Sequence, residues 1–196
     1  MEVIDDAARA AVLVEGLSDR AALEVLARRR GLDRAGDGVA IVAIGGATNI
    51  SRYLERYGPR GRRLEIAGLC DAGEEPALRR RLARAGLGED LSRQEMEGLG
   101  FFVCDRDLED ELIRALGVEG VERVIAAEGE IASFRIMQRQ PAQRGRSSEE
   151  QLRRFIGTRS GRKIRYGALL AAALDPGRVP HPLAGVLDWM CSRLPS

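Results

Sequence analysis

Several residue types that build common functional sites are scarce in this 196-residue chain: it has one histidine, one tryptophan, three cysteines and 4% aromatic residues. The lone His181 makes His-rich metal sites and a Ser-His-Asp triad poor candidates. Three widely spaced cysteines predict neither a disulfide framework nor a zinc knuckle, and they favour a reducing, cytoplasmic setting. No apolar run approaches the roughly 18 residues of a membrane span, so we expect no membrane partner. The acidic N-terminal sequence also lacks the pattern of a signal peptide.

Lysine is nearly absent, because Lys163 is the only lysine among 31 basic residues. An arginine bias of this kind can reflect genome composition alone. A lysine that persists against such a bias is a candidate for a chemical role, although a single residue can also persist by chance.

The net charge of +1 hides an uneven distribution. Residues 132–165 contain nine arginines and Lys163 against only two glutamates, a local charge of +8, so the remainder of the chain carries −7. An acidic body with a basic flank is typical of a protein that binds a polyanion. The alternative is a solvated surface in an arginine-rich protein. The low aromatic content argues against base-specific readout in either case.

Short apolar runs alternate with segments whose apolar residues recur at helical spacing. This alternation predicts an α/β fold with a mostly parallel four-stranded sheet flanked by helices. We expect residues 1–130 to form this core and residues 131–196 to form a basic, mainly helical extension packed on it. The expected strands are residues 11–14, 39–44, 64–70 and 100–104.

Acidic residues follow three of these strands. Glu15 and Asp19 follow the first strand, Asp71 follows the third, and Asp107 and Glu109 follow the fourth. Right-handed crossovers place the carboxyl ends of parallel strands at one edge, where such sheets bind ligands. Carboxylates brought together repel one another unless a cation compensates. Mg²⁺ or Mn²⁺ suits an all-oxygen site, and two such ions about 4 Å apart stabilise both oxygens of a phosphoryl transfer.

A glycine pair, Gly45-Gly46, follows the second strand and precedes Thr48 and Asn49. Backbone amides there could bind a phosphate at the start of a helix. A tight turn at the end of a strand explains the same residues equally well.

The segment VLVEGLSDRAALEVLA (12–27) resembles the signature of the Toprim domain, which topoisomerases, primases and certain nucleases share. That signature is a strand, Glu-Gly-x-Ser/Thr-Asp and a helix. LCDAGEE (69–75) resembles its later acidic motif, in which Asp71 matches the first acid. Gly73 stands where the second acid is usual, and Glu74 or Glu75 could replace that acid.

Among Toprim domains, the sequence is most similar to that of the OLD (overcoming lysogenization defect) nucleases. RDLEDEL (106–112) resembles their Asp-Leu-Glu motif, and GRK (161–163) resembles the region of a lysine near the end of their catalytic module. OLD proteins also carry an ATPase, but no GxxxxGK[ST] motif occurs in this sequence. The resemblance therefore implies a Toprim module that stands alone or works with a separately encoded ATPase.

The resemblance implies a Rossmann-like Toprim fold and a DNA endonuclease or nickase that uses two divalent metals, Mg²⁺ or Mn²⁺. Glu15 would be a metal ligand and general base, and Lys163 would stabilise charge on the scissile phosphate. The implied metal ligands are Glu15, Asp19, Asp71, Glu75, Asp107 and Glu109. The basic flank would bind the DNA or RNA backbone through Arg135, Arg139, Arg144, Arg146, Arg153, Arg154, Arg159 and Arg162.

Two other interpretations stay open. One is a different Toprim activity, such as RNA processing or primer synthesis. The other is a non-catalytic nucleic-acid-binding or regulatory protein, which the glycine at position 73 favours. Covalent topoisomerase chemistry is the poorest candidate, because it needs a nucleophilic tyrosine in a separate domain and the chain offers only Tyr53, Tyr57 and Tyr166.

Overall fold

The structure is a computed structural model of the chain that describes residues 2–32, 38–157 and 161–193. Its centre is a four-stranded sheet in which every pairing is parallel and the strand order is β2-β1-β3-β4. The predicted α/β fold is therefore confirmed, with strand ends that differ from the predicted ends by one residue. The strands are β1 (Ala10–Val14), β2 (Val39–Ala43), β3 (Glu65–Asp71) and β4 (Phe101–Cys104).

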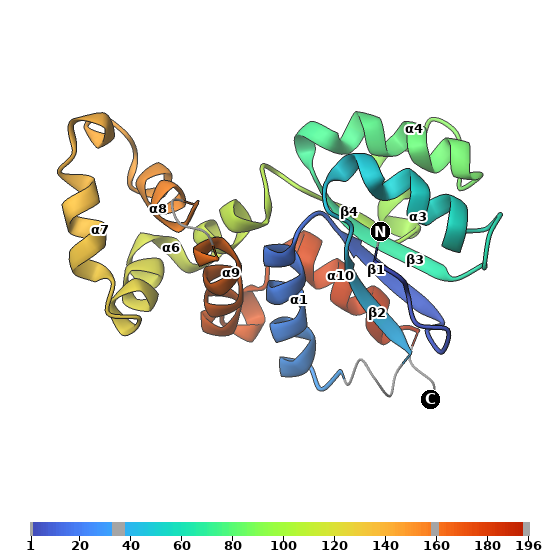
Figure 1. Cartoon of the computed structure of the whole chain (residues 1–196), viewed down its shortest axis with the longest axis horizontal. Coiled ribbons are helices and arrows are strands. Elements are labelled where there is room, and N and C mark those ends of the chain that lie inside the picture. The colour runs from blue at the N-terminus through green and yellow to red at the C-terminus, as the bar shows by residue number, and fades with distance from the viewer. Residues whose placement is uncertain (1, 33–37, 158–160, 194–196) are drawn as a thin grey trace.

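Helices cover both faces of the sheet (Figure 1). A hydrophobic cluster lies on each face of the sheet, and successive residues of β1 belong to alternate clusters. Val12 and Val14 face the side of α1 and α10, whereas Ala11 and Leu13 face the side of α3 and α4. This alternation follows from the two-residue period of a strand, and burial on both faces explains why the strands are continuously apolar. The helices are α1 (Leu17–Arg29), α3 (Ile50–Tyr57), α4 (Glu75–Ala85), α5 (Arg93–Gly98), α6 (Leu108–Ala127), α7 (Ile131–Gln138), α8 (Ser148–Gly157), α9 (Arg162–Ala173) and α10 (His181–Cys191).

Strands β1 and β3 are neighbours, yet their following helices lie on opposite faces of the sheet. Helix α1 covers one face, and α4 covers the other. In open parallel sheets, a crevice forms between the carboxyl ends of two neighbouring strands whose following helices lie on opposite faces. Glu15 follows β1 and Asp71 ends β3, so both acids lie at this crevice.

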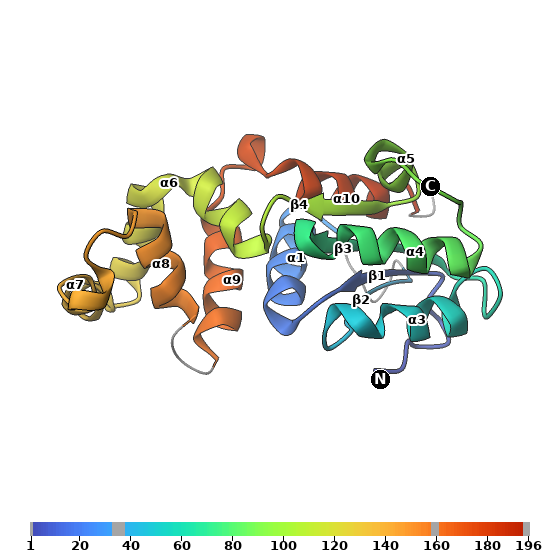
Figure 2. The same ribbon diagram turned by 90° about the horizontal axis from the view of Figure 1, so that it is seen from above.

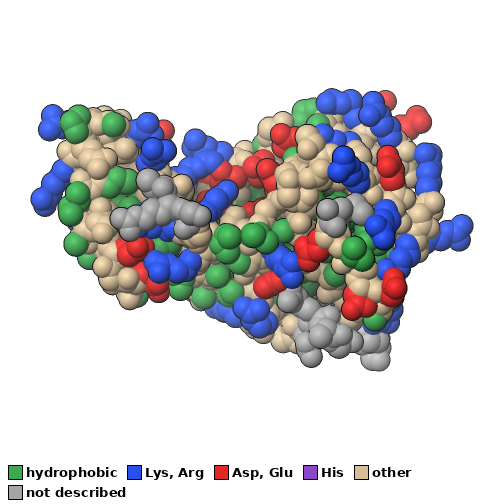
Figure 3. All heavy atoms as spheres, in the orientation of Figure 1, with side chains coloured by type: hydrophobic (Ala, Val, Ile, Leu, Met, Phe, Trp, Pro, Cys, Tyr) green, Lys and Arg blue, Asp and Glu red, His purple; other side chains and the backbone are tan. Residues whose placement is uncertain are grey.

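The chain leaves β4 through α6, whose second half forms a helical lobe with α7 and α8 (Figures 1 and 2). Gly117 has φ 69° and ψ 165° and breaks α6 into two helical segments, a conformation that glycine adopts at low cost. Helix α9 then packs on α1, where a Cβ at Gly167 would lie 2.9 Å from the carbonyl oxygen of Ser18. The space-filling view shows a depression between the lobe and the sheet (Figure 3).

The C-terminal helices share the hydrophobic core of the sheet. Leu170 of α9 and Leu187 of α10 belong to the same buried cluster as Val12 of β1 and Phe155 of α8. The division of the chain at residue 130 stays a prediction. None of the helices in the described part of the chain combines the length and the apolar composition of a membrane span.

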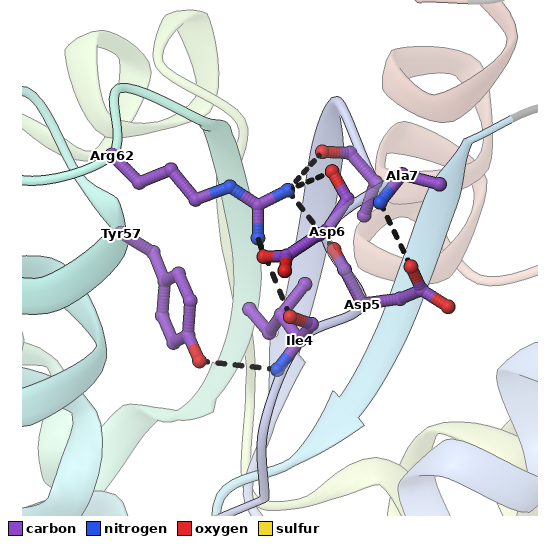
Figure 4. Close-up of polar contacts among 7 residues, drawn as sticks. Ile4, Asp5, Asp6, Ala7, Tyr57 and Arg62 are labelled. Atoms are coloured by element: carbon purple, nitrogen blue, oxygen red, sulfur yellow. Dashed lines mark hydrogen bonds and ion pairs between the residues drawn. The ribbon is translucent and has the colours of Figure 1, made fainter.

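The segment before β1 is tied to the helix α3 side of the sheet (Figure 4). The Arg62 guanidinium donates to the carbonyl oxygens of Ile4, Asp5, Asp6 and Ala8, and the backbone N–H of Ile4 donates to the Tyr57 hydroxyl at 3.1 Å. One side chain thus satisfies several carbonyls that have no strand partner. These contacts anchor the start of β1, whose other end precedes Glu15.

Candidate active site

A pocket of about 320 Å³ lies at the carboxyl edge of the sheet. It gathers acidic residues from the ends of three strands with the lone lysine, and the space-filling view shows acidic and basic side chains side by side in the depression there (Figure 3). All the predicted catalytic and metal-binding residues except Glu75 therefore share one cavity. The lining residues are Glu15, Gly16, Ser18, Asp19, Gly45, Gly46, Asp71, Asp107, Glu109 and Lys163.

Asp19 lies in the first turn of α1, where its carboxylate accepts a hydrogen bond from the backbone N–H of Gly16 at 2.8 Å. An acid at this position accepts a hydrogen bond from a free N–H group, and its negative charge is stabilised by the positive end of the helix dipole. Burial nevertheless raises the pKa of Asp19 to about 6, and the nearby charges of Glu109 and Glu15 add to this increase. The helix start thus holds Asp19 in place, while its neighbours make its charge costly.

Asp71 has a similar environment at the end of β3. Burial and, to a smaller extent, the charges of Glu15, Asp19 and Glu109 together raise its pKa to about 6, against an opposite effect of Lys163. The carboxylates of three different strand ends therefore oppose one another's ionisation. A cation in the pocket would relieve this repulsion.

Glu109 lies in the first turn of α6 with a side chain only 4% exposed. The Lys163 ammonium of α9 lies 3.3 Å from Oε1 of Glu109. This contact is an ion pair without hydrogen-bond geometry, because the same oxygen is buried and accepts no hydrogen bond from the described residues. A buried carboxylate oxygen without such a partner is an exception that a bound cation would explain.

Asp107 caps the N-terminus of α6. Its Oδ1 accepts a hydrogen bond from the backbone N–H of Asp110 at 2.9 Å, and its Oδ2 forms an ion pair with the Arg153 guanidinium of α8. The pair joins the helical lobe to the acidic pocket. Sequence reasoning assigned Arg153 to a nucleic-acid surface and missed this contact, since no local pattern links α8 to the start of α6.

The donor chemistry of the pocket fits a hard divalent cation. The side chains that face it offer carboxylate oxygens without histidine or cysteine, as Mg²⁺ and Mn²⁺ prefer, and Glu109 has an oxygen without a hydrogen-bond donor. Within residues 2–32, 38–157 and 161–193, no three Asp, Glu, His or Cys side chains lie close enough together to hold a metal as they stand. The carboxylates would therefore have to turn inward around an ion.

Glu75 lies outside this pocket, contrary to its predicted place among the metal ligands. Its carboxylate forms ion pairs with Arg93 at 2.6 Å and with Arg79. Hydrogen bonds from Arg93 and Arg79 hold the pKa of Glu75 below its ordinary value. Its charge is thus already neutralised at the start of α4, and the structure does not bring it to the other acids.

The glycine pair after β2 favours the tight turn over the phosphate cradle. Gly45 and Gly46 have φ values of 73° and 112°, and both backbone N–H groups donate to the carbonyl oxygen of Glu15 at 3.1 Å. The side chain of Asn49 closes the turn by donating to the carbonyls of Ile44 and Gly45. These amides are therefore not free for a phosphate. Their observed role is to fix the backbone of Glu15 at the pocket.

The arginines of the basic flank do not share one environment. Arg162 is buried, donates to the carbonyl oxygen of Phe155 at 3.1 Å and to Glu130 at 2.9 Å, and lies over the Phe155 ring. It is a structural residue and does not belong to the predicted nucleic-acid surface. Arg159 lies outside the described residues. The other side chains are exposed or half-buried: Arg135, Arg139, Arg144, Arg146, Arg153 and Arg154.

A doubly wound parallel sheet with carboxylates at three strand ends defines an α/β domain of the Toprim class. Residues 8–70 match the family model described as "Overcoming lysogenization defect protein-like, TOPRIM domain". Over this segment the chain is thus similar to an OLD-like TOPRIM domain, as its Glu-Gly-x-Ser-Asp motif predicted.

Solved structures with the same fold include the C-terminal regions of two OLD proteins. The region from Burkholderia pseudomallei is 22% identical, with a TM-score of 0.68, and the match covers 94% of this chain and 98% of that one. The region from Xanthomonas campestris pv. campestris is 26% identical, with a TM-score of 0.67, and the match covers 94% and 95%. The likeness therefore spans the helical lobe as well as the sheet. A search among curated proteins found no significant match.

Proposed function

We propose that this protein is an endonuclease or nickase that cleaves phosphodiester bonds of DNA with two divalent cations, Mg²⁺ or Mn²⁺. The observation that carries the proposal is the convergence of carboxylates from three strand ends with the only lysine in one pocket of an OLD-like TOPRIM domain. Mutually repelling buried carboxylates are unfavourable for folding alone, so their convergence favours a role in holding cations.

The residues divide into two groups around the pocket. Glu15, Asp19 and Asp71 would hold one cation between the ends of β1 and β3, and Asp107 and Glu109 at the start of α6 would hold the second. Bound cations at this edge would supply Lewis-acid stabilisation of charge on the reacting phosphate.

Lys163 would act on the phosphate rather than hold a metal. Its ammonium lies at the mouth of the pocket, 55% exposed and 3.3 Å from Glu109. A point charge at this place can stabilise the negative charge that develops on the scissile phosphate. Exposed arginines of the lobe would hold the backbone on either side through counterion release. An ATPase that works with this chain stays a prediction.

A second candidate is a nucleic-acid-binding protein without cleavage activity. Two observations favour it: the acids do not form a ready-made ligand group among the described residues, and position 73 carries no acid. A Cβ at Gly73 would meet no atom within 4 Å, so nothing steric excludes an acid there. On this second candidate, Gly73→Asp would create cleavage that the natural chain lacks.

The two candidates separate in a plasmid assay. Supercoiled DNA is incubated with the purified protein and Mg²⁺ or Mn²⁺, alongside Glu15→Ala, Lys163→Ala and the control Glu55→Ala, which removes an exposed acid of α3. We expect metal-dependent nicking that EDTA abolishes, a loss of about 100-fold or more in the first two variants, and no loss in the control. Salt-sensitive DNA binding without cleavage of DNA or RNA by either metal would favour the second candidate.

A further inference from the structure

The two carboxylate oxygens of Asp107 have different partners. Its Oδ1 accepts the hydrogen bond from the backbone N–H of Asp110 that caps α6. Its Oδ2 is held by the Arg153 guanidinium. A cation on Asp107 would share this carboxylate with the positively charged Arg153 guanidinium, so the cation and Arg153 compete for Asp107.

Arg153 is itself only partly satisfied in this position. Its Nη1 is buried and donates no hydrogen bond to any described residue, while Nη2 pairs with Asp107. A guanidinium presents paired donors that match two oxygens of a phosphate. A phosphate group could accept hydrogen bonds from both nitrogens of Arg153, whereas Asp107 pairs with only one of them.

Arg153 also lies on the element that carries the basic flank. It belongs to α8, beside Arg154 and after the exposed Arg144 and Arg146, whereas Asp107 belongs to the acidic pocket. The ion pair is thus a direct contact between the surface expected to meet the backbone and the carboxylates expected to hold cations.

We propose that Arg153 couples DNA binding to cation binding: it neutralises Asp107 in the free protein and releases Oδ2 when the DNA backbone takes its guanidinium. The inference rests on the proposed function, because it assumes that Asp107 holds a cation. In the free state, Arg153 competes with the cation for Asp107. In the DNA-bound state, the competitor is withdrawn, so DNA and cation each strengthen the binding of the other by the same factor.

The test measures binding rather than cleavage. The affinity for Mn²⁺ is determined from the electron paramagnetic resonance signal of free Mn²⁺, with and without a double-stranded DNA that carries phosphorothioate linkages and stays intact on a gel. In the natural protein, we expect DNA to tighten Mn²⁺ binding about tenfold. In Arg153→Gln, Mn²⁺ binding should already be tighter by about tenfold without DNA, and DNA should add less than about twofold.

Two further variants separate the coupling from general effects of charge and fold. Arg144→Gln removes an exposed charge of the same flank, so it should weaken DNA binding, but at saturating DNA it should leave the tightening of Mn²⁺ binding close to that of the natural protein. Arg153→Lys keeps a charge at Asp107 but lacks the paired donors, so it should retain weak Mn²⁺ binding without DNA and lose part of the tightening. Circular dichroism confirms that each variant is folded.

The outcomes are distinct. If Mn²⁺ binds the natural protein but DNA does not change its affinity, or if Arg153→Gln retains the full tightening, the coupling is refuted and the nuclease proposal stands. If Mn²⁺ binds neither with nor without DNA, the proposed function fails, and the coupling fails with it.

Discussion

Replacing Asp19 by asparagine should stabilise the metal-free protein while removing its response to divalent cations. The carboxylate of Asp19 shares its pocket with Glu15, Asp71 and Glu109. Burial, together with the charges of Glu109 and Glu15, raises its pKa from 3.8 to about 6. An asparagine is nearly isosteric, and its amide oxygen can still accept the hydrogen bond from Gly16 that starts α1. The substitution thus removes the charge and keeps the cap.

The size of the effect follows from proton linkage. Between pH 4 and 6, roughly, the folded protein keeps a proton on Asp19 that the unfolded chain has lost, so this group lowers the free energy of unfolding as the pH rises. Above about pH 6, the difference between 3.8 and about 6 corresponds to a cost of at most about 3 kcal/mol. The hydrogen bond from Gly16 to an uncharged asparagine is weaker than that to the carboxylate, which lowers the stability of the variant by about 1 kcal/mol. The variant should therefore gain about 2 kcal/mol, which is about 4–8 °C in Tm for a chain of this size.

The assay is thermal unfolding at pH 4 and pH 8, in EDTA and in excess Mn²⁺. In EDTA, the advantage of Asp19→Asn should be present at pH 8 and absent at pH 4. In Mn²⁺ at pH 8, the natural protein should gain stability by mass action, whereas the variant should gain little. The matched control is Asp175→Asn, in which the carboxylate replaced is an exposed cap that accepts from the backbone N–H of Gly177.

Either of two results would refute a destabilising charge at Asp19. If Asp19→Asn melts no higher than the natural protein at pH 8 in EDTA, the acids do not oppose one another as the pocket geometry requires. An equal gain at pH 4 and pH 8 would also contradict it, because a pH-independent gain cannot come from the charge of Asp19.

Three more predictions follow from individual contacts. Glu75→Gln should leave metal-dependent nicking within about twofold of the natural rate, since its carboxylate pairs with arginines outside the pocket; a loss comparable to that of Glu15→Ala would return Glu75 to the metal ligands. Gly167→Ala should cost about 1–3 kcal/mol in chemical denaturation and slow nicking, because its Cβ would press on the Ser18 carbonyl and shift the helix that carries Lys163; unchanged stability would mean that α9 packs differently on α1. Arg62→Ala should cost about 1–3 kcal/mol through the carbonyls of Ile4, Asp6 and Ala8 that it leaves unpaired before β1, and it should not change Mn²⁺ affinity at a temperature where the variant is folded.

Much of the scaffold could be predicted from the sequence, because local patterns specify it. Apolar runs bounded by glycine and acids predicted all four strands to within a residue or so, and the helical spacing after each run predicted the crossovers. The placement of Glu15, Asp71 and Glu109 at one edge followed from the parallel direction of the strands, whose carboxyl ends lie at the same edge of the sheet. Asp19 was equally predictable, since an acid in the first turn of α1 is fixed by the free N–H groups there.

The partners of individual charged side chains could not be predicted in the same way. Glu75 follows β3 as the other acids follow their strands, yet it turns to arginines of α4 and α5. Arg162 lies in the most basic part of the sequence and is buried against Glu130 and Phe155. The glycine pair after β2 binds a backbone carbonyl instead of a phosphate. In each case the partner is either a side chain far away in the sequence or a backbone carbonyl. Every residue has such a carbonyl, so the sequence does not show which one is used.

The sequence by itself thus determined the class of fold, the edge at which the acids meet and the identity of the lone lysine. Only the tertiary structure decided which acids face the pocket and that Arg153 of α8 holds Asp107 of the α6 cap. The physical reason is the range of the interactions. Hydrogen-bonded helices and strands repeat over a few residues and leave a pattern in the sequence, whereas an ion pair between distant elements depends on how those elements pack.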